Sequence, residues 1–159
     1  MAISHIHVGA FEAKVRCDDS ARIYIDGVLV ATTQSYRDRW ISEITDDAQL
    51  VAVDCENFSY GDPGGLLAWF GNGVASDSTW RCSGQGTAAA AAAVWYDLDF
   101  DDSGWSRAYE VQNNPSTTTE RYWSEDENFP SSAKWIWRDA DFKVEEHSYC
   151  RRWLNNGEK

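Results

Sequence analysis

The sequence contains no apolar segment long enough to span a bilayer and almost no clustered basic residues. Its longest apolar run, residues 88–95, falls far short of the ~20 residues that a membrane-spanning helix needs. Lys and Arg number 14 against 26 Asp and Glu, a formal net charge of −12, and the one basic pair is Arg151-Arg152. Because phosphate binding depends on clustered Lys and Arg, we expect no nucleic acid partner and no membrane insertion.

No two of the four cysteines form a Cys-x-x-Cys pair, which argues against a zinc knuckle or a redox motif. Cys17, Cys55, Cys82 and Cys150 each lie in or beside a segment with strand character. Their even number permits disulfides, among which we expect Cys82–Cys150, while free buried thiols are the alternative. Residues 1–5 have neither the basic nor the apolar region of a signal peptide. We nevertheless favour a secreted or extracellular location.

The sequence also lacks the common catalytic motifs. It has no Gly-x-Ser-x-Gly elbow, no phosphate-binding glycine loop and no His-Glu-x-x-His helix. Carboxylate pairs such as Asp46-Asp47 and Glu145-Glu146 are adjacent, whereas a glycosidase needs two carboxyls about 5–9 Å apart across a cleft. We therefore predict a protein that is not an enzyme, with a hydrolase as the least favoured alternative.

Short segments of alternating apolar and polar residues are what the chain does have. Residues 11–17 alternate in this way and residues 21–26 repeat the pattern, so we expect the two strands to form a hairpin with Asp18 and Asp19 in the tight connection between them. Asp26-Gly27 then supplies two residues that tolerate positive φ, as a type I′ hairpin turn requires, and residues 28–30 form the return strand. Further strands are expected at residues 49–55, 66–70, 79–83, 133–137 and 148–153. With no sustained helical period, the pattern predicts one all-β sandwich domain over residues 1–159, closed by a sheet that contains the last two segments.

Several motifs follow one another along the chain in a characteristic order. They are Asp18-Asp19-Ser20 with residues 24–27, then residues 50–57, Pro63-Gly64-Gly65, and residues 78–83, 99–105, 133–137 and 149–152. In this order they resemble the galactose-binding-domain-like modules that are appended to many glycoside hydrolases, such as bacterial rhamnosidases, and that occur alone in some invertebrate proteins. The resemblance implies a jelly-roll β-sandwich.

The joint at Asp18-Asp19-Ser20 is also similar to the calcium site of the flocculin-type sugar-binding modules of yeast adhesins. In those modules two adjacent aspartates, joined by a cis peptide bond, hold a calcium ion that binds sugar hydroxyls. The resemblance implies that Asp18 and Asp19 are calcium ligands, and we add Asn57 from a neighbouring strand end because calcium prefers carboxylate and amide oxygens. The alternative is that both aspartates only accept hydrogen bonds from turn amides.

Nine tryptophans offer indole rings on which sugars can stack, although most tryptophans of an all-β domain fill its core. Trp40, which follows a polar run, and Trp69, which follows a glycine-rich loop, are the two best placed to face a ligand. The residues that we assign to the core are Trp80, Trp105, Trp135 and Trp137.

The loop at residues 57–65 is a second candidate for ligand contacts. It carries the polar side chains of Asn57, Tyr60 and Asp62 beside backbone that Gly64 and Gly65 leave accessible. A simple glycine turn is the alternative interpretation of this loop.

These observations together predict a lectin that binds glycans or glycoproteins without modifying them. Galactose-type sugars are the ligands that we expect first, and calcium is the candidate cofactor. Single sites of this kind are weak, so we expect a homo-oligomer that gains avidity from repeated sites. The alternative of a different class is a structural or protein-interaction β-sandwich with no sugar site.

Overall fold

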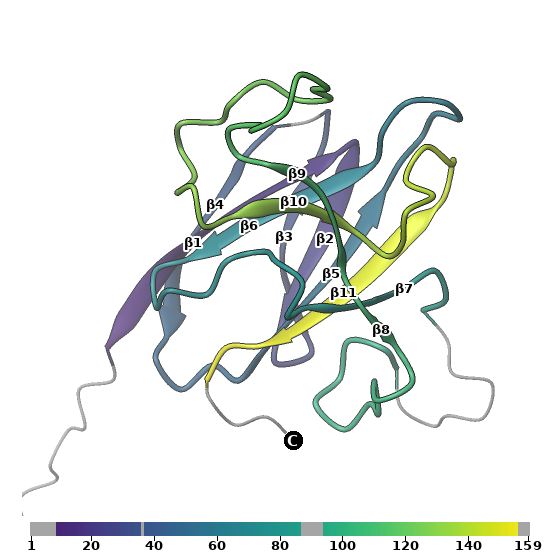
Figure 1. Cartoon of the computed structure of the whole chain (residues 1–159). Helices are drawn as coiled ribbons and strands as arrows, with labels where there is room; N and C mark the ends of the chain where they lie inside the picture. Colours follow the sequence, from purple (N-terminus) through teal and green to yellow (C-terminus); the bar gives the residue numbers. More distant parts are fainter. Residues whose placement is uncertain (1–8, 36, 87–93, 156–159) are drawn as a thin grey trace, which may run out of the picture.

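The computed structural model describes residues 9–35, 37–86 and 94–155, which form two antiparallel sheets (Figure 1). The five-stranded sheet has the order β4 (Arg39–Thr45), β1 (Ala10–Asp18), β6 (Gly65–Phe70), β10 (Lys134–Trp137) and β9 (Tyr109–Asn113). The six-stranded sheet has the order β3 (Val28–Thr33), β2 (Ser20–Ile25), β5 (Leu50–Glu56), β11 (His147–Trp153), β7 (Arg81–Ser83) and β8 (Ser106–Arg107). The predicted all-β sandwich is confirmed. Within these residues no helix is long and apolar enough to cross a membrane.

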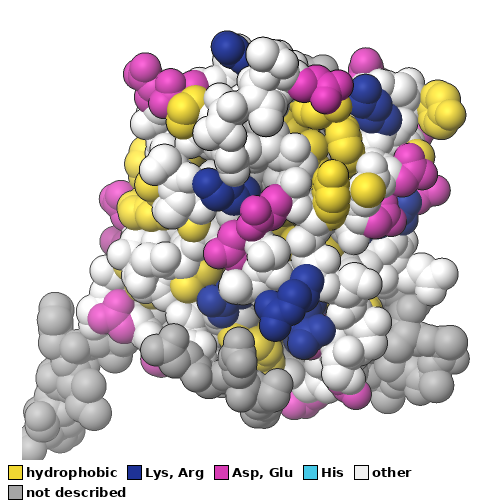
Figure 2. Space-filling model, viewed as in Figure 1, with side chains coloured by type: hydrophobic (Ala, Val, Ile, Leu, Met, Phe, Trp, Pro, Cys, Tyr) yellow, Lys and Arg dark blue, Asp and Glu magenta, His cyan; other side chains and the backbone are white. Residues whose placement is uncertain are grey.

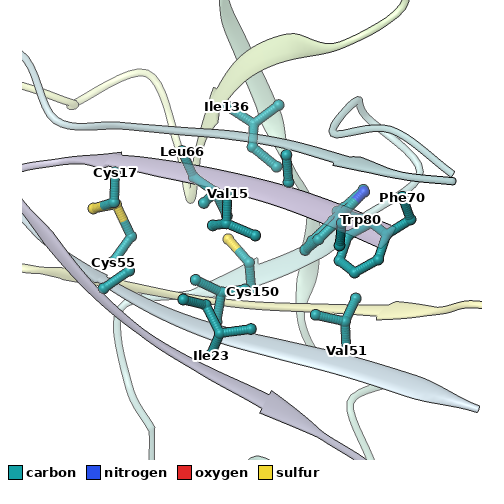
Figure 3. Packing of buried hydrophobic residues seen from close by; sticks show 14 of the residues in the cluster. Val15, Cys17, Ile23, Val51, Cys55, Leu66, Phe70, Trp80, Ile136 and Cys150 are labelled. Atoms are coloured by element: carbon teal, nitrogen blue, oxygen red, sulfur yellow. A yellow bond between two sulfur atoms is a disulfide. The ribbon is translucent and has the colours of Figure 1, made fainter. Parts of the chain in front are cut away.

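The main core lies between the two sheets (Figure 3). Val15 of β1 and Leu66 of β6 face Ile23 of β2 and Val51 of β5, and all four are fully buried. The alternation that predicts the strand at residues 11–17 has its cause here, because every second side chain of β1 enters this layer. Burial of such side chains stabilises the fold by about 25 cal/mol per Å² of apolar surface removed from water, and this stabilisation holds the two sheets together.

Both possible disulfides are formed. Cys17 of β1 pairs with Cys55 of β5 and therefore joins one sheet to the other, as Figure 3 shows. Cys82 of β7 pairs with Cys150 of the adjacent strand β11, which confirms the predicted pair. The alternative of free thiols is wrong, since no cysteine is left unpaired.

The β2–β3 hairpin turns at Asp26-Gly27 as predicted. Asp26 and Gly27 have φ values of 49° and 82°, the positive values that a type I′ turn requires. The Asp26 carboxylate also accepts hydrogen bonds from the amides of Gln49 and Leu50, at 2.9 and 2.8 Å. The turn is thereby tied to the start of β5.

Two strand pairings differ from the sequence-based expectation. β1 and β2 do not form a hairpin: β1 pairs with β4 and β6, whereas β2 pairs with β3 and β5. The Asp18-Asp19 joint therefore carries the chain from one sheet to the other. Likewise β10 and β11 lie in different sheets rather than in one closing sheet, because the loop at residues 138–146 crosses between the layers.

Each sheet also carries a smaller apolar cluster on its outer face. On the five-stranded sheet, Leu67 and Trp135 are covered by Trp123 and Phe129 of the long loop that follows β9. On the six-stranded sheet, Ala52 is covered by the segment that contains Trp95 and Phe100.

The tryptophans predicted for the core divide accordingly. Trp80, Trp135 and Trp137 are fully buried, as expected. Trp105 is a correction: it is only half-buried, because it packs edge-on against Phe100 at the rim of the outer cluster rather than between the sheets.

Candidate functional site

The Asp18-Asp19 joint lies at one end of the sandwich, beside loops from three other parts of the chain. Asp18 ends β1 in register with Gly65 of β6, and the Asp19 amide donates to the Glu56 carbonyl at 2.8 Å. The peptide bond between the two aspartates is cis. The loops at residues 57–64, 114–133 and 138–146 surround this end of the molecule (Figure 1).

Each carboxylate accepts a hydrogen bond from one of these loops. The indole Nε1 of Trp123 donates to Asp18 Oδ2 at 2.9 Å, and the Phe58 amide donates to Asp19 Oδ2 at 2.7 Å. The pKa of Asp18 is raised to about 6, chiefly by burial and also by the neighbouring Asp19, while the Trp123 hydrogen bond acts in the opposite direction. Asp19 itself is only 8% exposed. The joint therefore concentrates negative charge in a partly dehydrated position.

Asn57 is fixed directly after β5 and joins two loops. It is 1% exposed, and its Nδ2 donates to the carbonyls of Asp62 and Val144 at 2.8 and 2.9 Å. Its Oδ1 atom accepts a hydrogen bond from the Ser59 amide at 3.3 Å. Hydrogen bonds to two loops therefore hold the Asn57 side chain in one orientation.

These oxygens are of the kind that calcium and other hard cations accept as ligands. Asp18, Asp19 and Asn57 supply carboxylate and amide oxygens from two strand ends that the Asp19–Glu56 hydrogen bond holds together. Among the described residues no group of three or more His, Cys, Asp or Glu side chains is placed to hold a metal. A metal here would thus depend on the amide and backbone oxygens that calcium accepts and zinc rarely uses.

The glycines of the 57–65 loop have a different role from the one expected. Gly64 and Gly65 are buried, which corrects the expectation that their backbone is open to a ligand. A Cβ atom on Gly64 would lie 2.8 Å from Trp137, and one on Gly65 would lie 2.6 Å from Trp123. Both glycines are needed so that tryptophan rings can pack on the backbone. Tyr60, which is 83% exposed, and the exposed Asp62 occupy the tip of the same loop.

Trp40 and Trp69 form a separate group on the outer face of the five-stranded sheet. Lys14 of β1 is in register with both, and its Nζ lies 3.8 Å from the centre of the Trp40 ring. Trp40 is 55% exposed, whereas Trp69 is half-buried. Lys14 is four residues from Asp18, about 13 Å along a strand, so this pair does not belong to the Asp18-Asp19 joint.

An aromatic cavity beside the joint has no counterpart in the sequence-based prediction. It has a volume of about 320 Å³ and lies between β9 and the loop that follows it, lined by Tyr109, Tyr122, Phe142 and polar side chains. Tyr122 packs against Trp123, with 6.0 Å between ring centres, and so connects the cavity to the Asp18 carboxylate. The sequence signal for this region is the Tyr122-Trp123 pair inside an otherwise polar loop.

No family model, no curated protein and no solved structure matches the chain.

Proposed function

We propose that the protein is a jelly-roll, galactose-binding-domain-like lectin that binds glycans or glycoproteins without catalysis, assisted by calcium. The observation that carries the proposal is the pair of carboxylates, Asp18 and Asp19, positioned one aromatic ring away from a cavity lined by tyrosines. Such a site offers the two kinds of contact that a sugar needs: polar partners for its hydroxyls and flat rings for its C–H faces.

Calcium is proposed to bind between the Asp18 and Asp19 carboxylates, with Asn57 Oδ1 as the third side-chain oxygen. Two adjacent carboxylates repel each other, and burial makes that repulsion more costly than in water. A divalent cation removes the repulsion, and its remaining coordination positions accept water or sugar hydroxyls.

The aromatic cavity is proposed to hold the sugar ring. Tyr109 lies parallel to Phe142, and Tyr122 meets Phe142 edge to face at 5.1 Å between ring centres. Galactose is the first sugar to test, because three of its ring hydrogens make one apolar face suited to such a surface. The hydroxyls would find Asn113 and Glu120 on the polar side of the cavity.

A homo-oligomer is proposed through the outer edge of β3, which among the described residues is paired on one side only, with β2. Val28, Leu29 and Val30 are 64%, 50% and 42% exposed on a strand that ends its sheet. Unpaired edge strands with exposed apolar side chains readily pair with a second copy. We also propose an extracellular location, because both disulfides persist in oxidising surroundings.

Binding to a glycan array with and without a calcium chelator tests the function, together with Asp19→Asn. Asparagine has the same shape and still accepts the Phe58 amide, so the free energy of unfolding should change by less than about 1 kcal/mol. Glycan binding should fall at least about tenfold, because one charged calcium ligand is lost.

Asp101→Asn is the matched control, because Asp101 is an exposed aspartate whose carboxylate accepts the Ser103 amide in a turn. It removes the same charge and should bind as the wild type does. Chelator-resistant binding would remove calcium from the proposal. Failure of the wild-type protein to bind any glycan would instead favour the structural or protein-interaction module.

A further inference from the structure

Four arginines line one cavity at β7, β8 and β11 of the six-stranded sheet, although the chain as a whole carries a net charge of −12. Arg107 of β8 is directly opposite Arg81 of β7, and Arg81 is directly opposite Arg151 of β11. Arg152 follows next on β11. Like charges at opposed positions of neighbouring strands destabilise a sheet unless something of opposite charge lies between them.

The described residues supply only one such counter-charge. Arg151 is buried and donates its Nε to the Asp102 carboxylate at 2.9 Å, and its remaining hydrogen bonds go to backbone carbonyls of the 95–100 segment. Arg81 donates to the Trp105 carbonyl at 3.0 Å, and Arg152 donates its Nε to the Thr79 hydroxyl at 3.0 Å. Neither of these acceptors is charged.

Among the described residues, therefore, Arg81, Arg107 and Arg152 form no ion pair. The guanidinium of Arg107 also has no hydrogen-bond partner in this part of the chain. Other basic side chains of the described residues, such as Arg22 and Arg121, also form no ion pair, so the missing counter-charge alone does not distinguish this group. What distinguishes it is that Arg81, Arg107 and Arg152 line one cavity with Arg151, in a chain where acidic residues far outnumber basic ones.

The arginines line a small polar cavity of about 90 Å³ together with Thr79, Asp102 and the half-buried Trp153, and the Asp102 carboxylate is taken up by Arg151. Figure 2 shows the basic side chains gathered over the part of the molecule where β7, β8 and β11 lie in Figure 1. The volume holds several water molecules but not a sugar ring. It suits a single oxyanion group, which guanidinium groups bind through paired hydrogen bonds.

We propose that this cavity binds an oxyanion substituent of a glycan, namely a sulfate ester or a uronate carboxylate. The anionic group would lie among Arg81, Arg107 and Arg152, and the sugar that carries it would contact Trp153. The strongly acidic remainder of the surface disfavours a polyanion such as nucleic acid, which needs basic groups along many phosphates. That the anion is carried on a sugar rests on the proposed lectin function, whereas the anion site itself does not.

The experiment compares wild type, Arg107→Gln and Arg39→Gln by titration with inorganic sulfate, galactose 6-sulfate, galacturonate and galactose at low ionic strength. Arg39 is the matched control, an exposed arginine on β4 of the other sheet. We expect inorganic sulfate and at least one of the two charged sugars to bind the wild type and Arg39→Gln alike. Arg107→Gln should bind them at least about tenfold more weakly, the effect of one lost charge-assisted hydrogen bond.

The two charged sugars distinguish the two sources of the anion, because tighter binding of one of them identifies sulfate ester or carboxylate. Equal weakening in Arg107→Gln and Arg39→Gln would mean a general charge effect and would overturn the site. Tighter binding of a single-stranded DNA oligonucleotide than of either charged sugar would overturn the glycan assignment. Sulfate binding that persists when no neutral sugar binds would leave the anion site standing and remove the lectin function alone.

Discussion

Replacing Gly65 by alanine tests how closely the tryptophan layer determines the geometry of the Asp18 carboxylate. A Cβ atom at this position would lie 2.6 and 2.7 Å from two atoms of the Trp123 ring and 2.9 Å from Trp135. These rings are stacked, with 4.2 Å between their centres, so Trp123 cannot retreat without leaving Trp135 or its hydrogen bond to Asp18.

Overpacking of this kind costs typically 1–3 kcal/mol, and we expect about 2 kcal/mol for Gly65→Ala. For a domain of this length that corresponds to a fall of about 4–8 °C in the midpoint of thermal unfolding. Urea unfolding followed by tryptophan fluorescence measures the free energy, and near-ultraviolet circular dichroism reports the loss of the Trp123–Trp135 stack.

Gly104→Ala is the control, because a Cβ atom on Gly104 meets nothing within 4 Å and its φ lies outside the left-handed region. It should change the free energy of unfolding by less than about 0.5 kcal/mol. If Gly65→Ala were as stable as Gly104→Ala, with its near-ultraviolet spectrum unchanged, the tryptophan layer would not constrain the site and the reasoning would be refuted.

Two further predictions concern stability. Burial raises the pKa of Asp126, but hydrogen bonds from the Asn128 amide and from Arg16 lower it by more. Asp126→Asn should therefore lower the free energy of unfolding by about 1–3 kcal/mol at pH 7. In urea unfolding at several pH values, the difference between wild type and variant should shrink below pH ~4, because the wild-type carboxylate is protonated there. A difference that does not depend on pH would contradict this prediction. Replacing both Cys17 and Cys55 by alanine opens a loop of sequence separation 38 and should lower the free energy of unfolding by about 4 kcal/mol. A loss below about 1 kcal/mol in the same assay would show that this disulfide does not constrain the unfolded chain.

Features that depend on a few neighbouring residues could be predicted from the sequence. The alternation over residues 11–17 and the Asp26-Gly27 turn are local signals, because pleating and positive φ act on adjacent residues. The sequence suggests Asp18, Asp19 and Asn57 as candidate ligands, and the structure brings their two strand ends together through the Asp19–Glu56 hydrogen bond.

Features that arise from contacts between distant segments could not be predicted in this way. The segment at Asp18-Asp19 looks like a hairpin joint, but the partners of β1 and β2 lie far along the chain and separate the two strands into different sheets. Lys14 alternates like a surface residue and yet is buried, because Trp40 and Phe129 cover it from other elements.

The arginine-lined cavity shows the same limit more clearly. Its basic side chains come from positions 81, 107, 151 and 152, and only the last two are neighbours in the sequence. Their convergence depends on the register of β8, β7 and β11, which no local pattern specifies. The linear sequence has no basic cluster beyond Arg151-Arg152, whereas the folded chain brings Arg81 and Arg107 beside this pair.

The disulfide between the sheets has a consequence for how such a protein can diversify. Cys17 immediately precedes Asp18, and Cys55 lies two residues before Asn57, so the bond anchors both strand ends just beneath the candidate ligands. The loops at residues 57–64, 114–133 and 138–146 rise above this anchored base. Loop lengths and side chains can therefore change in descendants or designed variants while the backbone of Asp18 and Asp19 keeps its place.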